Sequence, residues 1–234
     1  MNIEIKPLLS YHGISLFPNE YQAVLAIERT FGRVIPHLTR ANVQSAFGFI
    51  LEDNHITELK LTQFSLEGLI KITFLPDELC HLTKLKVLDL QLTDVRFLPN
   101  DFGQLNQLEI VNLRCNRIES LPESFGHLSH LRQLDLSHNC LKELPILFQD
   151  LDNLQYLDLS SNQLQQLPES IGSCQSLEFL DVNKNHLCNL PITFGSLSHL
   201  RQVDLSHNAL ESFPSTMDRL MKLEILDLRQ NKIE

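Results

Sequence analysis

Leucine recurs at a fixed spacing of 23 residues along most of the chain, at Leu85, Leu108, Leu131, Leu154, Leu177, Leu200 and Leu223. A strict period of this length indicates supersecondary units that cannot bury an apolar face alone and therefore stack on their neighbours. Inside one unit, apolar and polar residues alternate as Gln133, Leu134, Asp135, Leu136 and Ser137. Because side chains alternate across a strand, the pattern predicts short parallel strands with leucines inside and polar residues outside.

Two further residue types recur with the same period and predict turns, and we call each set of equivalent positions in successive repeats a column. Asparagine follows each strand, at Asn116, Asn139, Asn162, Asn185, Asn208 and Asn231. We expect these amides to pair backbone groups that leave the sheet, and we expect weaker hydrogen bonding in the first regular unit, where Thr93 replaces asparagine. Proline holds one later position, at Pro76, Pro99, Pro122, Pro145, Pro168, Pro191 and Pro214. Its fixed φ and missing donor help to end strand pairing.

Residues 1–55 do not repeat, and we expect them to form a cap over the apolar end of the array. Asn19 and Gln22 are spaced like a capping box, and Gly32 follows an apolar face, so a helix is predicted over residues 19–31. Phe47–Leu51 and Ile56–Leu61 predict a hairpin whose second strand enters the array.

The array divides by regularity into three parts. Residues 56–84 form an irregular first repeat with an extra stretch around Gly68, residues 85–222 are regular, and residues 223–234 form a partial last repeat. The partial last repeat would leave the edge of its strand unpaired. We expect that the chain is a fragment of a longer protein or that another chain covers this edge. A second copy of the chain is one such partner for the edge.

The unit L-x-x-L-x-L-x-x-N-x-L resembles a leucine-rich repeat, and the resemblance extends from about Ile56 to Glu234. The Leu-Pro pair and the Phe-Gly-x-Leu segment make it similar to the intracellular Ras-suppressor type of 23 residues, which is also common in prokaryotes. The resemblance implies an α/β solenoid, or horseshoe, with a parallel sheet on its concave face. It specifies a scaffold rather than a partner, because the same fold serves unrelated ligands.

The composition limits the classes of partner that the chain is expected to bind. The net charge is −10 and lysine and arginine form no long runs, which argues against nucleic acid and against an anionic membrane surface. A protein with a basic or mixed-charge surface is the expected partner. The N-terminus does not resemble a secretory signal, and five scattered cysteines suggest a reducing compartment, so a cytoplasmic location is expected.

One column of the predicted concave face carries aromatic residues. Tyr156 and Phe179 occupy the position before the first inward leucine in adjacent repeats, and Ile110 occupies it nearer the N-terminus. Exposed aromatic residues are enriched at binding hot spots, so this pair is the leading contact prediction. The alternative is that the two rings simply cover the sheet.

The next column is acidic and consists of Asp89, Asn112, Asp135, Asp158, Asp181, Asp204 and Asp227. Closely spaced carboxylates repel each other, so solvent, hydrogen bonds or cations must compensate. Two interpretations of this column remain open: it has a structural role, or it forms an acidic stripe that selects basic partners. A calcium site is not predicted, because no glycine-bearing loop wraps an ion. The predicted rim residues are Arg114, Lys184, Arg229, His138 and His207.

Motifs for catalysis, cofactors and metal ligation are absent from the sequence. There is no phosphate-binding loop, dinucleotide fingerprint, nucleophile elbow or paired zinc-ligand spacing. We therefore expect neither an enzyme nor a cofactor, but a protein-interaction scaffold in intracellular signalling. The alternative is a recognition arm of a larger signalling or effector protein, such as a ligase or GTPase, whose catalytic part lies elsewhere.

Overall fold

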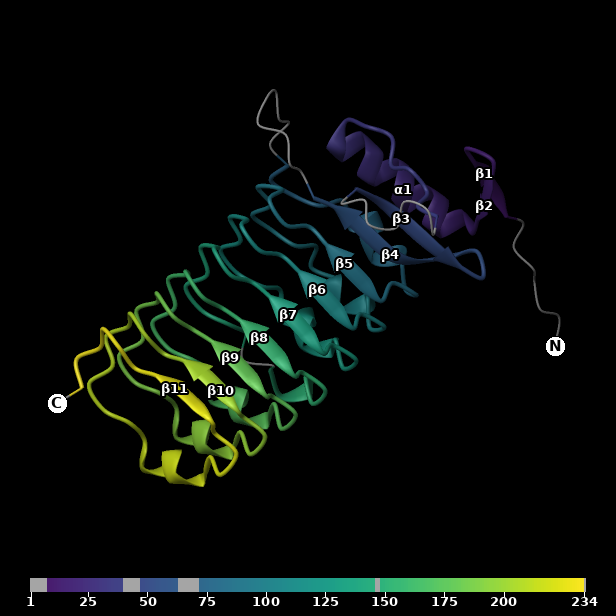
Figure 1. Ribbon diagram of the computed structural model, residues 1–234. Helices are drawn as coiled ribbons and strands as arrows, with labels where there is room; N and C mark the ends of the chain where they lie inside the picture. The colour runs from purple at the N-terminus through teal and green to yellow at the C-terminus, as the bar shows by residue number, and fades with distance from the viewer. Residues whose placement is uncertain (1–7, 40–46, 63–71, 146–147, 234) are drawn as a thin grey trace.

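The computed structural model describes residues 8–39, 47–62, 72–145 and 148–233, which form a repeat array with a cap at one end (Figure 1). A nine-stranded sheet runs through the array in the order β11-β10-β9-β8-β7-β6-β5-β4-β3. Strands β4 to β11 are parallel, and from β5 onward each residue pairs with the residue 23 positions later, as Tyr156 pairs with Phe179. The repeat strands are β5 (Val87–Asp89), β6 (Ile110–Asn112), β7 (Gln133–Asp135), β8 (Tyr156–Asp158), β9 (Phe179–Asp181), β10 (Gln202–Asp204) and β11 (Ile225–Asp227).

The cap combines a small hairpin, one helix and a larger hairpin. Its elements are β1 (Leu9–Tyr11), β2 (Ile14–Leu16), α1 (Pro18–Phe31), β3 (Phe47–Glu52) and β4 (His55–Leu61). Strands β3 and β4 pair antiparallel, and β4 then pairs in parallel with β5. The predicted hairpin is thus confirmed as the link to the array. The domain boundary at residue 55 stays a prediction.

The predicted helix is present and starts one residue earlier than expected, at Pro18, but the predicted capping role of Asn19 is wrong. The N-cap residue is Phe17, and it makes no side-chain capping bond; Pro18 is the first helical residue and Asn19 lies inside the first turn. Proline explains the shift, because its fixed φ suits the first helical position, where no backbone donor is needed. The helix ends at Gly32, whose φ of 63° gives a left-handed cap.

The core is a continuous stack of apolar side chains. Leu134, Leu157 and Leu180 are fully buried in consecutive repeats, and Phe102 stacks on Phe125 with ring centroids 5.6 Å apart. A Cβ atom on Gly172 would lie 2.4 Å from the carbonyl oxygen of Thr193 in the next repeat. Repeats therefore approach too closely there for any residue but glycine.

The asparagine column joins each repeat to both neighbours. Asn162 Nδ2 donates to the carbonyl oxygens of Leu136 and Leu159, each at 3.0 Å, and Oδ1 accepts from Leu141 N at 3.0 Å. The hydroxyl of Thr93 lies 2.8 Å from both Leu90 O and Asn116 Oδ1, and its single hydrogen can serve only one of these acceptors at a time. Asparagine has two amide donors and reaches the carbonyls of two repeats, so the side chain at position 93 makes fewer hydrogen bonds than the asparagines do, as expected.

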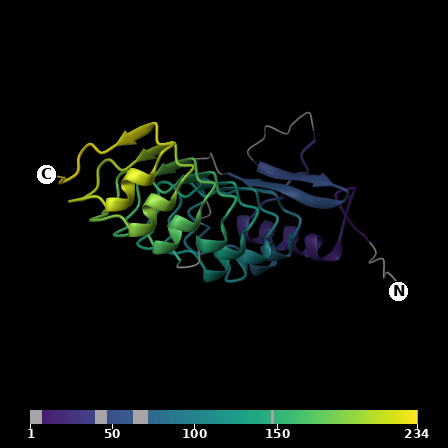
Figure 2. The ribbon, with the colours of Figure 1, turned by 90° about the horizontal axis from the view of Figure 1, so that it is seen from below.

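Short 3-10 segments return the chain on the side opposite the sheet (Figure 2). Most follow the proline column directly, and the backbone N–H three residues after Pro168 bonds to its carbonyl at 3.0 Å. A 23-residue unit is too short for a long helix as well as a strand and two turns. These segments are η1 (Asp77–His81), η2 (Phe102–Gln104), η3 (Glu123–His127), η4 (Phe148–Asp150), η5 (Glu169–Ser173), η6 (Ile192–Ser196) and η7 (Ser215–Arg219).

Strand β11 is an edge of the large sheet. It pairs only with β10 in the described sheet, and Leu226 is 40% exposed although the residues it aligns with, Val203 and Leu180, are fully buried. Pairing of this edge with another chain stays a prediction.

The predicted extra stretch around Gly68 falls on residues 63–71, which lie outside the described part of the chain. No helix in the described ranges has the length and apolar character needed to cross a bilayer.

Candidate binding surface

The strands present their outward side chains in straight columns, because parallel pairing aligns equivalent residues of successive repeats. We call this side of the sheet the open face. One column is Val87, Ile110, Gln133, Tyr156, Phe179, Gln202 and Ile225, and the next begins at Asp89. The register brings the predicted aromatic and acidic residues together near the middle of the array, on β7, β8 and β9.

Tyr156 and Phe179 form a stacked pair on the open face. Their ring centroids are 4.5 Å apart and their planes differ by 3°. Both side chains are half-buried, and the strand register places Gln133 and Gln202 on either side of them. Burial, with the nearby Asp158 carboxylate, raises the pKa of Tyr156 to about 12. The predicted adjacency of the two rings is confirmed, and the pair offers a rigid apolar ridge.

The acidic column ends each strand with the same turn. Asp158 Oδ1 accepts the backbone N–H of Ser160 at 2.9 Å, and Asp181 Oδ1 accepts that of Asn183 at 2.8 Å. Asn112 Oδ1 does the same for Arg114 at 3.1 Å. The column therefore has the structural role that was one of its two predicted interpretations.

The middle of this column carries carboxylates that are difficult to ionise. Asp158 is 7% exposed, and burial raises its pKa. Burial, together with the charges of Asp158 and Asp204, raises the pKa of Asp181 to about 6. At the edge strand, by contrast, a hydrogen bond from Arg229 lowers the pKa of Asp227 to about 2. The central carboxylates would thus gain from an added positive charge, while Asp227 already has one.

Ser137 lies in an outward column, as predicted, but its side chain is not exposed there. It is fully buried, because its neighbours cover it: its hydroxyl donates to Asp135 Oδ1 at 2.6 Å and accepts from Arg114 Nη1 at 3.1 Å. Ser160 and Ser206 occupy the same column and are also buried. The sequence showed this column as a serine that recurs after Asp-Leu. It did not show that Arg114 covers Ser137, because that contact depends on packing between repeats.

The predicted rim residues occupy two different positions. Arg114 lies beside the acidic column, as expected. Lys184, His138 and His207 are exposed and have left-handed backbone angles, with φ of 53°, 55° and 55°. All three belong to the position just before the asparagine column, at the border of the open face. The structure places Lys184 and His207 in adjacent repeats and His138 two repeats from Lys184.

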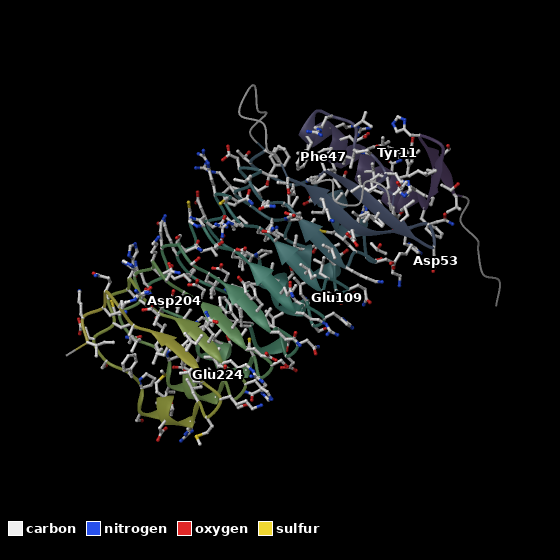
Figure 3. All side chains as sticks on the ribbon, viewed as in Figure 1. Tyr11, Phe47, Asp53, Glu109, Asp204 and Glu224 are labelled. Atoms are coloured by element: carbon white, nitrogen blue, oxygen red, sulfur yellow. The ribbon has the colours of Figure 1, made fainter. Side chains whose placement is uncertain are left out.

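Alternating charges form the opposite border of the open face. The column contains Lys86, Glu109, Arg132, Gln155, Glu178, Arg201 and Glu224. Arg201 lies 3.7 Å from Glu178 and 2.9 Å from Glu224, and Figure 3 shows Glu109 and Glu224 along the same border. Because the three positive and three negative side chains of this column cancel, the acidic character of the open face comes from the aspartate column.

Metal binding finds no support in the part of the chain that the structure describes. There, no group of three or more histidine, cysteine, aspartate or glutamate side chains is arranged to hold an ion. The five cysteines are free thiols, and burial raises the pKa of Cys80 and Cys174 to about 12, so neither is a ready thiolate.

A parallel strand in every unit, an asparagine column and an apolar stack define a repeat solenoid with one open sheet face. The chain belongs to the leucine-rich repeat family: the family pattern, described as leucine rich repeat, matches residues 83–141, 106–164, 144–187 and 191–233. No curated protein matches the sequence significantly.

Solved structures with similar folds include a leucine-rich repeat protein of Leptospira interrogans, with 29% identity, a TM-score of 0.69 and coverage of 84% of this chain and 46% of that one. The structure of PEPR1 with AtPEP1 has 26% identity, a TM-score of 0.75 and coverage of 90% and 31%. The plant peptide hormone receptor RGFR1, solved in complex with RGF2, has 25% identity, a TM-score of 0.64 and coverage of 85% and 34%. The chain thus spans less than half the length of each of these proteins.

Proposed function

We propose that the chain binds a protein or peptide through the centre of its open face. The observation that carries this proposal is the stacked Tyr156–Phe179 pair, which lies directly beside the Asp158 and Asp181 carboxylates. A half-buried, stacked aromatic pair provides contact area at small entropic cost, and the adjacent charges provide specificity. Ile110, Asp135, Arg114, Lys184, His138 and His207 are the proposed surrounding contacts.

The proposed partner segment carries a basic residue that reaches the acidic column. A cation placed near Asp158 and Asp181 stabilises the ionised forms, which burial now disfavours. Asp158 and Asp181 each make their turn bonds through Oδ1, so a guanidinium or ammonium group approaching Oδ2 need not disturb the turn. The net charge of −10 also accelerates association with a basic partner.

The related structures support this mode of binding. RGFR1 is described as a peptide hormone receptor in complex with RGF2, so a similar repeat fold accommodates a peptide ligand in that protein. We extend this to the present chain as a proposal, with the basic segment lying across several parallel strands. The proposal assigns binding, rather than catalysis, to the array.

A second proposal concerns the setting in which the binding takes place. We propose a recognition role within intracellular signalling, either alone or as one part of a larger protein. The free thiols of all five cysteines support a reducing, cytoplasmic location. The greater length of the similar proteins supports the larger assembly.

The test is a selection of random displayed peptides against the wild-type protein, followed by affinity measurement on a double variant, Tyr156→Ala with Phe179→Ala. We expect enrichment of arginine or lysine in the selected peptides and a loss of affinity of at least about tenfold in the variant, as for a truncated hot spot. The matched control is Phe74→Ala with Phe97→Ala, which removes two exposed rings from paired positions elsewhere.

The control should bind like wild type, and all proteins should be compared at matched thermal stability. Peptides that are rich in acidic residues, or that bind the double variant as well as wild type, would contradict the proposal. If the peptides bind the Phe74→Ala, Phe97→Ala control more weakly and the Tyr156→Ala, Phe179→Ala variant as well as wild type, the binding surface lies near Phe74 and Phe97 and not at the centre of the open face.

A further inference from the structure

A second site lies where the cap meets the array. A cavity of about 200 Å³ opens between the start of α1, the start of β4 and the end of η1 with the residues just after it. Its lining residues are Phe17, Pro18, Asn19, Glu20, His55, His81 and Thr83. The cap hairpin and helix therefore enclose a space that no single element could form.

Glu20 supplies a buried acceptor in the wall of this cavity. The side chain is 4% exposed, and its Oε1 atom accepts from His55 Nδ1 at 3.1 Å and from Ile56 N at 3.4 Å. Its other oxygen, Oε2, is buried and has no hydrogen-bond partner among the described residues. Burial raises the pKa of Glu20, which shows how poorly the charge is compensated. A buried, unpaired carboxylate oxygen is costly and is stabilised by a donor, most strongly by a charged one.

The rest of the lining selects the type of donor. The imidazole of His81, the amide oxygen of Asn19 and the hydroxyl of Thr83 can accept hydrogen bonds, and the lining residues include neither lysine nor arginine. Phe17 stacks on His55 with ring centroids 4.4 Å apart and so holds that imidazole beside Glu20. An anion would be repelled by Glu20, and the described residues contain no three-ligand group for a metal.

We propose that this cavity binds a primary ammonium group, with the Glu20 carboxylate as its counter-charge and Phe17, His55 and His81 as its walls. An ammonium has a single positive charge and three donors, which match the uncompensated charge of Glu20 and the neutral acceptors of the lining. The group can belong to a free small amine or to a lysine side chain of a partner. The site is independent of the open-face proposal, since it lies where the cap meets the array and uses none of the same residues.

The test titrates the complete chain with n-butylamine, which is protonated at neutral pH, and follows the imidazole resonances of His55 and His81 by NMR. The neutral isostere n-butanol is titrated in parallel. We expect saturable shifts with butylammonium alone, and at least about a tenfold loss of affinity in Glu20→Gln, because the negative charge that attracts the ammonium is lost. The matched control is Asp53→Asn, which removes the same charge from the adjacent hairpin turn, where φ of 51° suits asparagine.

Titration with Nα-acetyl-lysine N-methylamide distinguishes the two sources of the amine. Binding of this compound at least as tight as that of butylamine supports a lysine side chain of a partner, while binding of butylamine alone supports a free amine. Absence of saturable shifts in the wild type, equal binding of butanol, or an unchanged affinity in Glu20→Gln overturns the proposal. The comparison with butanol uses only the wild-type protein, so it holds even if Glu20→Gln fails to fold.

Discussion

The carboxyl group of Asp181 illustrates how the repeat geometry sets residue chemistry. In-register stacking places it between Asp158 and Asp204, and partial burial removes water that would otherwise stabilise its charge. Its pKa of about 6 lies above the ordinary value of 3.8. The protonated form is therefore favoured in the fold, and ionisation as the pH rises through about 6 reduces the free energy of unfolding.

Asp181→Asn should therefore stabilise the protein at neutral pH. Asparagine keeps the Oδ1 acceptor, and Asn112 already occupies the same column with its turn bond intact. We expect a gain of about 1 kcal/mol, a value reduced for the partial exposure of the carboxylate, that declines as the pH falls from about 7 to about 4. Urea unfolding at several pH values measures it. A gain that does not change with pH would show that charge is not its cause.

The left-handed position before the asparagine column gives a second test at this scale. Ser161 has φ of 55°, an angle that glycine adopts freely and β-branched residues adopt at high cost. We expect Ser161→Val to lower the free energy of unfolding by about 1 to 2 kcal/mol and Ser161→Gly to change it little. Chemical denaturation of both variants measures the difference. Equal stabilities would mean that the turn relaxes without strain.

At the scale of one element, the asparagine turn holds two repeats together. Asn162→Ala would leave the N–H of Leu141 without its partner, and it would remove one of the two amide donors from each of the Leu136 and Leu159 carbonyls. We expect a loss of about 2 to 4 kcal/mol, because several buried backbone groups are affected at once. Thermal and urea unfolding measure it. The exposed neighbour serves as the control, since Gln163→Ala should change stability by less than about 0.5 kcal/mol.

Most elements were predictable from the sequence because each repeats seven times or carries its own local signal. The period alone placed Tyr156 beside Phe179, and Gly32 marked the end of α1. The capping role predicted for Asn19 was wrong because Pro18 starts α1 one residue earlier. The buried Glu20 was not predicted, since its burial depends on His55, which is 35 residues away in the sequence. Local patterns identify elements, whereas contacts between distant elements decide which polar residues are buried.

For the whole molecule, stability should vary along the array, because each repeat contacts only its neighbours. Leu180 has a stacked repeat on both sides and is fully buried, whereas Leu226 in β11 is 40% exposed and its strand pairs only with β10. The cap covers the other end, where Leu59 of β4 is fully buried. Local opening should therefore cost least at β11 and most in the central repeats.

Amide hydrogen exchange tests this gradient directly. We expect the backbone N–H groups of β11 to exchange at least about tenfold faster than those of β8, a difference in opening free energy of about 1.4 kcal/mol or more. Leu157→Ala, which removes a fully buried side chain from β8, should cost about 2 to 5 kcal/mol and raise exchange in the central repeats toward the rate at β11. If β11 instead exchanges as slowly as β8 and slows further with protein concentration, its edge is covered by a second copy of the chain, as the exposed strand predicts.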